Sequence, residues 1–229
     1  MTILDVLDEV SRQYDVDSYT IVHCLKRAVR DELGLGEVFD NYKDGKLDFY
    51  EMFVDKNNQQ KQRRVKITQK RLNYVRDRLY RYIIEKNTQE RLEAIKSSLA
   101  ADKVVRGKIV SKSDYGLEIS TKFGKAFAPM NLLNPKEIED GRYKIGIDLN
   151  FHIHKLGIKK NKINIVLDRV SKFLTEHIIK EVLGDGYTIY TMQRMFGKRI
   201  KIYIDKEPSK EERELLSMSL NEKVKFKLM

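Results

Sequence analysis

The sequence predicts an α+β fold made of several units. Two observations predict it. The spacing of apolar residues changes from a helical period of about 3.6 to a strand period of about 2, and back, along the chain. The length of 229 residues suits one to two ordinary domains or three small ones. We expect an N-terminal α+β unit with a long helix at 1–100, a central five-stranded barrel at 101–170 and a small α+β unit at 171–229.

Composition excludes several classes of protein. Hydrophobic residues make up 41% of the chain, enough for a core, yet no apolar run approaches the roughly 20 residues of a membrane span. The N-terminus lacks the basic and apolar regions of a secretory signal. The single Cys24 excludes a disulfide framework and a zinc site built mainly on cysteine. We therefore expect a cytoplasmic protein without membrane contact.

Charge is distributed unevenly along the chain. The formal net charge is +11, with −6 in residues 1–60 and +17 in residues 61–229. A polyanion such as nucleic acid favours the basic part, because each neutralised phosphate releases counterions. The alternative is a Lys-rich protein with an ordinary solvated surface.

Two helices are expected at the start. Thr2 and Asp5 form a helix-start pattern, and apolar residues repeat at helical spacing through Val10. Residues 15–18 are typical of a turn and cap, and the second helix is expected to end at Gly34.

A hairpin and a helix complete the N-terminal unit. Asp44-Gly45 lies between two aromatic, β-prone runs within 38–54, which predicts a hairpin. The polar residues 57–62 predict a loop, followed by a short strand at 65–67. From residue 70 to 99 the period is helical, as one long helix or as two with a break near Asn87. Its polar face is either solvated or a contact surface for an acidic partner, and carries Lys70, Arg71, Arg78 and Arg81.

Five short strands are expected between residues 103 and 170. Five strands in about 70 residues cannot form an effective two-layer sandwich but can curl into a small closed barrel, so an OB-type barrel is expected. The candidates are 104–110, 117–120, 125–128, 149–154 and 163–167.

The remaining sequence alternates between helix and strand. We expect a helix from Lys172, two strands around a Gly197-Lys198 turn, a helix that begins near Pro208 and a last strand at 224–228. Proline and acidic residues at 207–212 match the preferences of a helix N-terminus.

The barrel segment resembles the S-one RNA-binding domain, a family of the OB-fold type. Residues 105–110 are similar to its opening G-x-V strand, and residues 114–117 to its D-[FY]-G-x turn. Residues 125–130 lie where the family has G-L-V-H-I-S, and residues 163–167 where it closes with I-x-L-S. The resemblance implies binding of single-stranded RNA.

The surrounding elements resemble the bacterial NusA family of transcription elongation and antitermination factors. Residues 22–28 are similar to its I-x-x-A-L-x-x-A helix, residues 41–45 to its D-x-x-[TS]-G turn, and residues 167–174 to the junction that enters its first KH domain. This resemblance implies that the N-terminal unit docks on RNA polymerase. A KH domain clamps nucleic acid with a G-x-x-G loop, which residues 171–229 lack, so we expect a KH-like unit without the clamp.

RNA-binding barrels use aromatic residues for stacking and basic residues for phosphates. The resemblance assigns Tyr115 to the first aromatic position and Lys162 to the basic position before the last strand, whereas Glu118 and Pro129 replace two further contact residues. Phe127 is either a stacking residue or part of the core. The predicted RNA-binding residues are Lys108, Lys112, Tyr115, Phe127, His152, His154, Lys159, Lys160, Lys162, Arg169, Arg194, Lys198 and Arg199.

Several of these residues have a second interpretation. His152 and His154 share a strand face, a spacing that also suits a metal, but no third ligand is suggested, so exposed donors to phosphate are the preferred interpretation. The basic turn at 159–162 is either solvated or in contact with phosphate. The same alternatives apply to the second basic patch around Arg194, Lys198, Arg199 and Lys201.

The sequence lacks recognisable catalytic motifs. It contains no phosphate loop, no G-x-G-x-x-G after a strand, no H-E-x-x-H and no G-x-S-x-G. Cys24 follows His23, but neighbours on a helix point about 100° apart, so they do not form a nucleophile and base pair. We expect Cys24 to be buried, Asp15 and Asp17 to act in a turn and cap, and the protein to need no metal or cofactor.

The expected function is that of a non-catalytic, NusA-like transcription factor that docks on RNA polymerase and holds emerging single-stranded RNA. It would affect pausing, termination or antitermination. One alternative is a ribosome- or mRNA-associated RNA-binding protein that acts in translation. Another is an enzyme, such as a nuclease subunit, whose site the sequence does not reveal.

Overall fold

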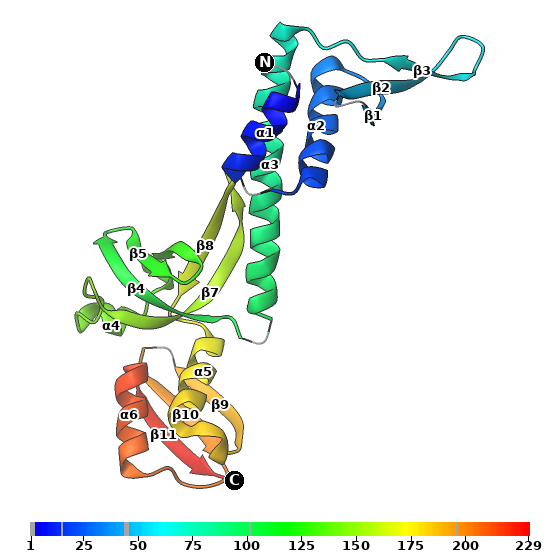
Figure 1. Cartoon of the computed structure of the whole chain (residues 1–229). Helices are drawn as coiled ribbons and strands as arrows, with labels where there is room; N and C mark the ends of the chain where they lie inside the picture. The colour runs from blue at the N-terminus through cyan, green and yellow to red at the C-terminus, as the bar shows by residue number, and fades with distance from the viewer. Residues whose placement is uncertain (1–2, 15, 44–45, 101, 196) are drawn as a thin grey trace. The chain divides into compact units, whose positions relative to one another are not determined.

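The computed structural model describes residues 3–14, 16–43, 46–100, 102–195 and 197–229. The chain divides into two compact units, Met1–Arg91 and Leu92–Met229. Its α+β architecture contains a five-stranded barrel and two three-stranded sheets (Figure 1). Within the described ranges, no helix combines the length and hydropathy that a membrane span requires.

The first unit begins with helices α1 (Ile3–Tyr14) and α2 (Ser18–Leu33). The side chain of Asp17 accepts a hydrogen bond from the N–H of Thr20 and caps α2. Gly34, with φ of 63°, ends it in the left-handed conformation. The predicted cap residue Thr2 and turn residue Asp15 lie outside the described residues.

Three antiparallel strands follow, in the order β1-β2-β3. Strands β1 (Glu37–Lys43) and β2 (Lys46–Val54) pair up to Lys43 and Lys46, while the predicted turn residues Asp44 and Gly45 lie outside the described residues. Strand β3 is Gln60–Arg64, so the predictions of a loop at 57–62 and a strand at 65–67 were wrong. All five residues of this edge strand are polar and exposed. The strand therefore lacks the alternation of apolar and polar residues from which a strand is predicted.

Helix α3 (Gln69–Ser98) is continuous, without the alternative break near Asn87. In the first unit, Val75, Leu79 and Ile83 of this helix pack into a core with α1, α2, β1 and β2. Arg78 on its basic face donates to the carboxylate of Glu32 at 2.8 Å, so this arginine stabilises the unit itself.

In the second unit, five strands form a closed barrel in the order β4-β5-β6-β8-β7. The strands are β4 (Val104–Ser113), β5 (Gly116–Thr121), β6 (Gly124–Pro129), β7 (Asp148–Lys159) and β8 (Lys162–Asp168). Neighbours are antiparallel except β6 and β8, which are parallel. The 3₁₀ turn η1 (Met130–Leu132) and the short helix α4 (Pro135–Glu139) lie between β6 and β7. The buried barrel core also includes Ile95 and Leu99, which precede the first strand.

The chain ends in a three-stranded sheet with two helices. Helix α5 (Lys172–Leu183) and turn η2 (Gly184–Gly186) precede β9 (Ile189–Met195), β10 (Arg199–Ile204), α6 (Lys210–Leu220) and β11 (Lys223–Leu228). The order is β11-β10-β9, with β11 parallel and β9 antiparallel to β10. Both helices pack against the sheet face that carries Ile200, Ile202 and Ile204 (Figure 1).

Candidate nucleic-acid interface

Strands β5 and β6 present polar and aromatic side chains on the outside of the barrel. Glu118 pairs with Phe127, and Ser120 pairs with Lys125. Directly opposed residues of an antiparallel pair project to the same face. The residues between them point into the barrel, because they are buried: Leu117, Ile119, Ala126 and Ala128. The four outer residues therefore form two adjacent rows across these strands.

Strands β4 and β8 extend these rows. Ser111 pairs with Glu118 and donates from Oγ to its Oε2 at 3.0 Å, and Lys108 pairs with Ser120. On the other side, Phe127 pairs with Val166 of β8. The predicted residue Lys108 therefore lies beside the same outer surface as Phe127.

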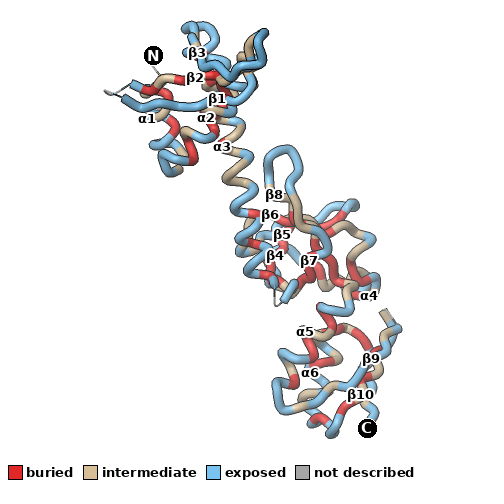
Figure 2. Tube along the Cα trace, turned by 90° about the vertical axis from the view of Figure 1, so that its right-hand side faces the viewer, coloured by how far each residue is buried: buried red, intermediate tan, exposed pale blue. Residues whose placement is uncertain are grey.

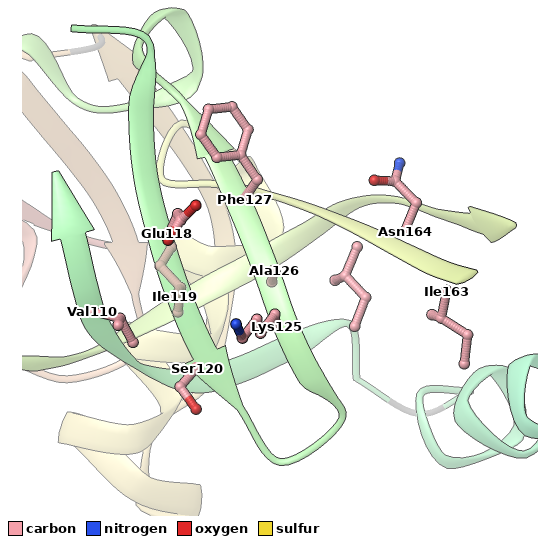
Figure 3. A pocket seen from close by; sticks show the side chains of 10 residues that line it. Val110, Glu118, Ile119, Ser120, Lys125, Ala126, Phe127, Ile163 and Asn164 are labelled. Carbon is pink, nitrogen blue, oxygen red and sulfur yellow. The ribbon is translucent and has the colours of Figure 1, made fainter. Parts of the chain in front are cut away.

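A groove of about 420 Å³ lies on this surface. Figure 3 shows Glu118 and Phe127 toward one end and Ser120 and Lys125 toward the other. Its volume lies within the range of about 300–1,000 Å³ that is typical of ligand sites. The groove is lined by Val110, Glu118, Ile119, Ser120, Lys125, Ala126, Phe127, Ile163, Asn164 and Ile165.

The ring of Phe127 packs against a glycine. A Cβ atom at Gly116 would lie 2.9 Å from Cζ of Phe127 and 2.2 Å from the backbone oxygen of Ala128, and Gly116 has φ of +150°. Only glycine allows both this conformation and this close approach. Of the two alternatives for Phe127, the structure gives a partly buried ring in the groove wall.

The groove combines an apolar lining with polar groups. Val110, which is exposed, and Ile163, which is half-buried, supply apolar surface, whereas Glu118 and Asn164 supply a carboxylate and an amide. A nucleobase has flat apolar faces and hydrogen-bonding edges, so this arrangement suits a base that is not paired in a duplex.

Two loops beside these strands carry further predicted residues. Tyr115, 84% exposed, lies in the turn between β4 and β5, which follows the exposed Lys112. The tip of the β7–β8 hairpin is exposed (Figure 2), and its turn residues Lys160 and Asn161 have positive φ of 51° and 55°. Lys159 and Lys162 pair directly across this tip. Positive φ is uncommon for lysine, so the turn holds Lys160 in a less favoured conformation between two further cations.

Arg169 does not belong to this exposed surface. It is 5% exposed and donates from Nε to Oε2 of the buried Glu137 at 3.0 Å and from Nη1 to the backbone oxygen of Asn150 at 2.5 Å. Its Nη2 also bonds Glu137, whose carboxylate accepts from the hydroxyl of Tyr143. Burial opposes the charge of Arg169, but Glu137 outweighs it and raises the pKa of Arg169. Its prediction as an RNA contact is corrected, because the guanidinium is enclosed in the protein.

Arg194 also has a structural position. Its Nη2 lies 2.7 Å from Oε1 of the buried Glu222, and its Nη1 donates to Oγ1 of Thr175 at 2.8 Å. The guanidinium thus joins β9 to α5 and to the turn before β11, which does not support its prediction as a phosphate contact. Lys198 and Arg199, predicted with it, are exposed.

The two predicted histidines lie beside one carboxylate. Nδ1 of His152 is 2.8 Å from Oδ2 of Asp168, and Nδ1 of the exposed His154 is 3.5 Å from the same oxygen. His152 is buried and stacks on Phe173, so its prediction as an exposed RNA contact is wrong. His154 has an exposed ring. Burial opposes the charge of Asp168, but hydrogen bonds from His152 and from the backbone of Ser171 outweigh it and lower the pKa of Asp168.

The described residues contain no group of three or more His, Cys, Asp or Glu side chains placed to hold a metal ion. Cys24 is buried, as predicted, and burial raises the pKa of its thiol above the ordinary value. A thiol with a raised pKa is a poor nucleophile at neutral pH.

Several residues of the groove were missed by the sequence analysis. They are Val110, Ser120, Lys125, Ile163 and Asn164. The alternation of Leu117-Glu118-Ile119-Ser120 was a usable signal, because it predicts that Glu118 and Ser120 share the outer face of β5.

Comparisons with known proteins do not assign a family. No family model matches the chain, and no curated protein matches it. One solved structure, the apo form of RNase R from Mycoplasma genitalium, is similar to part of it at 18% identity and a TM-score of 0.26. The match covers 43% of this chain and 18% of that protein.

Proposed function

We propose that this chain is an RNA-binding transcription factor of the NusA type, whose barrel groove holds nascent single-stranded RNA. The observation that carries the proposal is the groove on the outer face of β5 and β6, with the exposed Tyr115 at one adjoining loop and the basic β7–β8 tip at the other.

The position of the groove supports RNA as its ligand. We propose that the barrel is an OB-fold. The order β4-β5-β6-β8-β7 supports this, because it corresponds to strands 1-2-3-5-4 of a five-stranded Greek-key barrel. OB-folds bind oligonucleotides on strands 2 and 3 and at the loops between strands 1 and 2 and between strands 4 and 5. Tyr115 and Lys160 lie in those two loops.

The residues would divide the contacts. The ring of Phe127 and the apolar lining receive one base, Tyr115 stacks on a neighbouring base, and Lys108 and the hairpin lysines contact phosphates. Glu118 repels phosphate and accepts from base N–H groups. The backbone therefore runs along the edges of the groove, beside the lysines.

The polymerase part of the proposal concerns the first unit. Residues 1–60 are acidic and the rest of the chain is basic, so a different partner for each part is reasonable. We propose that the first unit docks on RNA polymerase and that the C-terminal unit is a KH-like fold without the G-x-x-G loop. Docking raises the local concentration of RNA at the groove and compensates for weak intrinsic affinity.

Two experiments test this proposal. Fluorescence anisotropy with a labelled oligouridine compares the natural chain with Phe127→Ala and with Tyr19→Ala, a matched change at an exposed aromatic residue outside the barrel. Loss of one stacked base, about 1–3 kcal/mol, weakens the Phe127 variant roughly fivefold or more, and the Tyr19 variant binds normally. Equal affinity of all three proteins contradicts binding in the groove.

Co-elution with bacterial core RNA polymerase tests the docking step. The full chain is compared with a chain that lacks residues 1–91, because Leu92, Ile95 and Leu99 belong to the second unit. Co-elution that requires residues 1–91 is expected. If the full chain binds RNA but does not co-elute with its cognate polymerase, a translation-associated RNA-binding role replaces the transcription role.

A further inference from the structure

The outer face of the C-terminal sheet carries basic residues on two adjacent strands, β10 and β11. Along β10 and β11, alternate residues point to the helix side and pack in the core: Ile200, Ile202, Ile204, Val224 and Phe226. The residues between them project from the opposite face, because side chains of a strand alternate. The outward residues of these two strands are Arg199, Lys201, Tyr203, Lys223, Lys225 and Lys227. We call these six residues the basic sheet face.

Like charges lie directly opposite each other on the basic sheet face. The parallel register pairs Arg199 with Lys223 and Lys201 with Lys225. Like charges directly opposite each other destabilise a strand pair. A sequence that repeats cations in this register sacrifices stability, which indicates that the charge serves another purpose.

An aromatic ring lies among these cations. Tyr203 pairs with Lys227, and the ammonium groups of Lys201 and Lys227 lie 5.0 and 5.8 Å from the centre of its ring. Tyr203 is partly exposed on this face. A ring flanked by lysines can stack on a base while its neighbours contact the flanking phosphates.

Carboxylates do not neutralise this face in the described part of the chain. On β9 the residues that pair with Arg199, Lys201 and Tyr203 are Met195, Gln193 and Thr191, which are uncharged. The next residue after β10 is Asp205, whose carboxylate accepts from the N–H of Thr188 at 3.0 Å. Four lysines therefore project from adjacent strands without an acidic residue between them.

We propose that the basic sheet face is a second RNA-binding surface, which contacts the phosphate backbone of a single strand and stacks one base on Tyr203. Cations two residues apart on one strand are about 7 Å apart, a regular spacing that suits a polymer of repeated charges. An unpaired base is required for stacking on an aromatic side chain. A lipid surface fits less well, because membrane-binding faces combine lysines with several inserted apolar side chains, and among the described residues this face offers Tyr203 and, on β9, Met195.

This surface uses none of the groove residues, so it can be tested separately from the proposed function. The test compares two full-length variants with equal loss of charge: K201Q/K225Q/K227Q on the basic sheet face, and K144Q/K180Q/K210Q at exposed lysines elsewhere in the second unit. Binding of a labelled single-stranded oligouridine is measured by anisotropy over a range of salt concentrations. Phosphatidylserine vesicles serve as the alternative polyanion.

The salt dependence distinguishes specific contacts from net charge. For a single strand, each lost phosphate contact lowers the magnitude of the slope of log affinity against log salt by about 0.7. The slope is therefore expected to fall by about 2 in the face variant and to stay unchanged in the control variant. Tyr203→Leu is expected to weaken binding roughly fivefold or more without changing the slope. The face variant is expected to melt no lower than the natural chain, because the substitutions relieve repulsion.

Two results overturn the proposal. The first is an equal change in the salt-dependence slope of the face and control variants, which would mean that binding depends on the net charge of the protein and not on this face. The second is normal RNA binding by the face variant together with loss of vesicle binding, which assigns the surface to lipid. Neither result bears on the groove, since Phe127 and Tyr115 are unchanged in both variants.

Discussion

Replacement of Arg169 by methionine tests the buried network beside the barrel. Arg169 and Glu137 are 5% and 1% exposed, and the arginine holds both oxygens of the carboxylate. Arg169→Met leaves a buried carboxylate. Among the described residues, it retains the hydroxyl of Tyr143 and the guanidinium of Arg142, whose Nη1 lies 3.3 Å away.

The expected cost is large. Breaking a buried ion pair by removing one partner lowers the free energy of unfolding by about 3–5 kcal/mol. We expect the lower end, about 3 kcal/mol, because Arg142 still pairs with Glu137. For a unit of this size, that corresponds to a fall in melting temperature of about 6–12 °C. Replacement of both residues, as Arg169→Met with Glu137→Met, is expected to restore most of the stability, since no buried charge is then left alone.

Thermal and urea unfolding, followed by circular dichroism, measure these changes, and RNA anisotropy is measured on the same proteins. The buried position of Arg169 is refuted if Arg169→Met lowers the free energy of unfolding by less than about 1 kcal/mol and clearly weakens RNA binding. That result would describe an arginine that contacts phosphate at the surface, and not a buried ion pair.

Further predictions concern the glycine under the groove, the acid sensitivity of the barrel and the single thiol. Gly116→Ala is expected to lower the free energy of unfolding by at least about 1–3 kcal/mol and to weaken RNA binding, because the added Cβ would clash with Ala128. Gly141→Ala is the control for backbone strain without a clash, because Gly141 also has a positive φ but nothing lies within 4 Å of an added Cβ. The lowered pKa of Asp168 contributes stability that is present above its ordinary pKa of 3.8 and is lost as the pH falls through the lower pKa of the folded state. Asp168→Asn is therefore expected to reduce the fall in melting temperature at acid pH, which melting curves over a range of pH measure. Cys24 is expected to resist iodoacetamide in the folded chain and to react in urea, because burial raises its pKa; rapid labelling of the native protein, followed by mass spectrometry, would contradict its buried position.

Most of the fold could be predicted from local patterns. Four of the five barrel strands and the elements after Lys172 lie within about three residues of their predicted ranges, because apolar and polar residues alternate there. Strand β7 continues to Lys159, five residues beyond its predicted end at His154. Strand β3 could not be predicted, because Gln60–Arg64 has no buried residue and therefore no apolar pattern. Besides the backbone pairing, its contacts to β2 include ion pairs, of Arg63 with Glu51 and of Arg64 with Asp48. The helical period from residue 70 to 99 predicted α3, but it did not decide between one continuous helix and two helices with a break near Asn87.

The candidate site was predictable only in part. The exposed Tyr115 and the lysines of the β7–β8 tip follow from the order of strands and turns. Arg169 and Arg194 could not be separated from surface cations, because their buried partners Glu137 and Glu222 lie 32 and 28 residues away in the sequence. The basic sheet face had a readable signal, since lysines alternate with apolar residues in 223–228.

The central claim is that RNA occupies the groove on β5 and β6. Photo-crosslinking of the full chain to an oligonucleotide that carries 5-iodouridine, followed by mass spectrometry of the linked peptides, tests it directly, because this base reacts with aromatic rings stacked on it. The account predicts links to Phe127 and Tyr115, with links to Tyr203 if the basic sheet face also binds. Links confined to residues 1–91, or to the C-terminal sheet without the barrel, would contradict it.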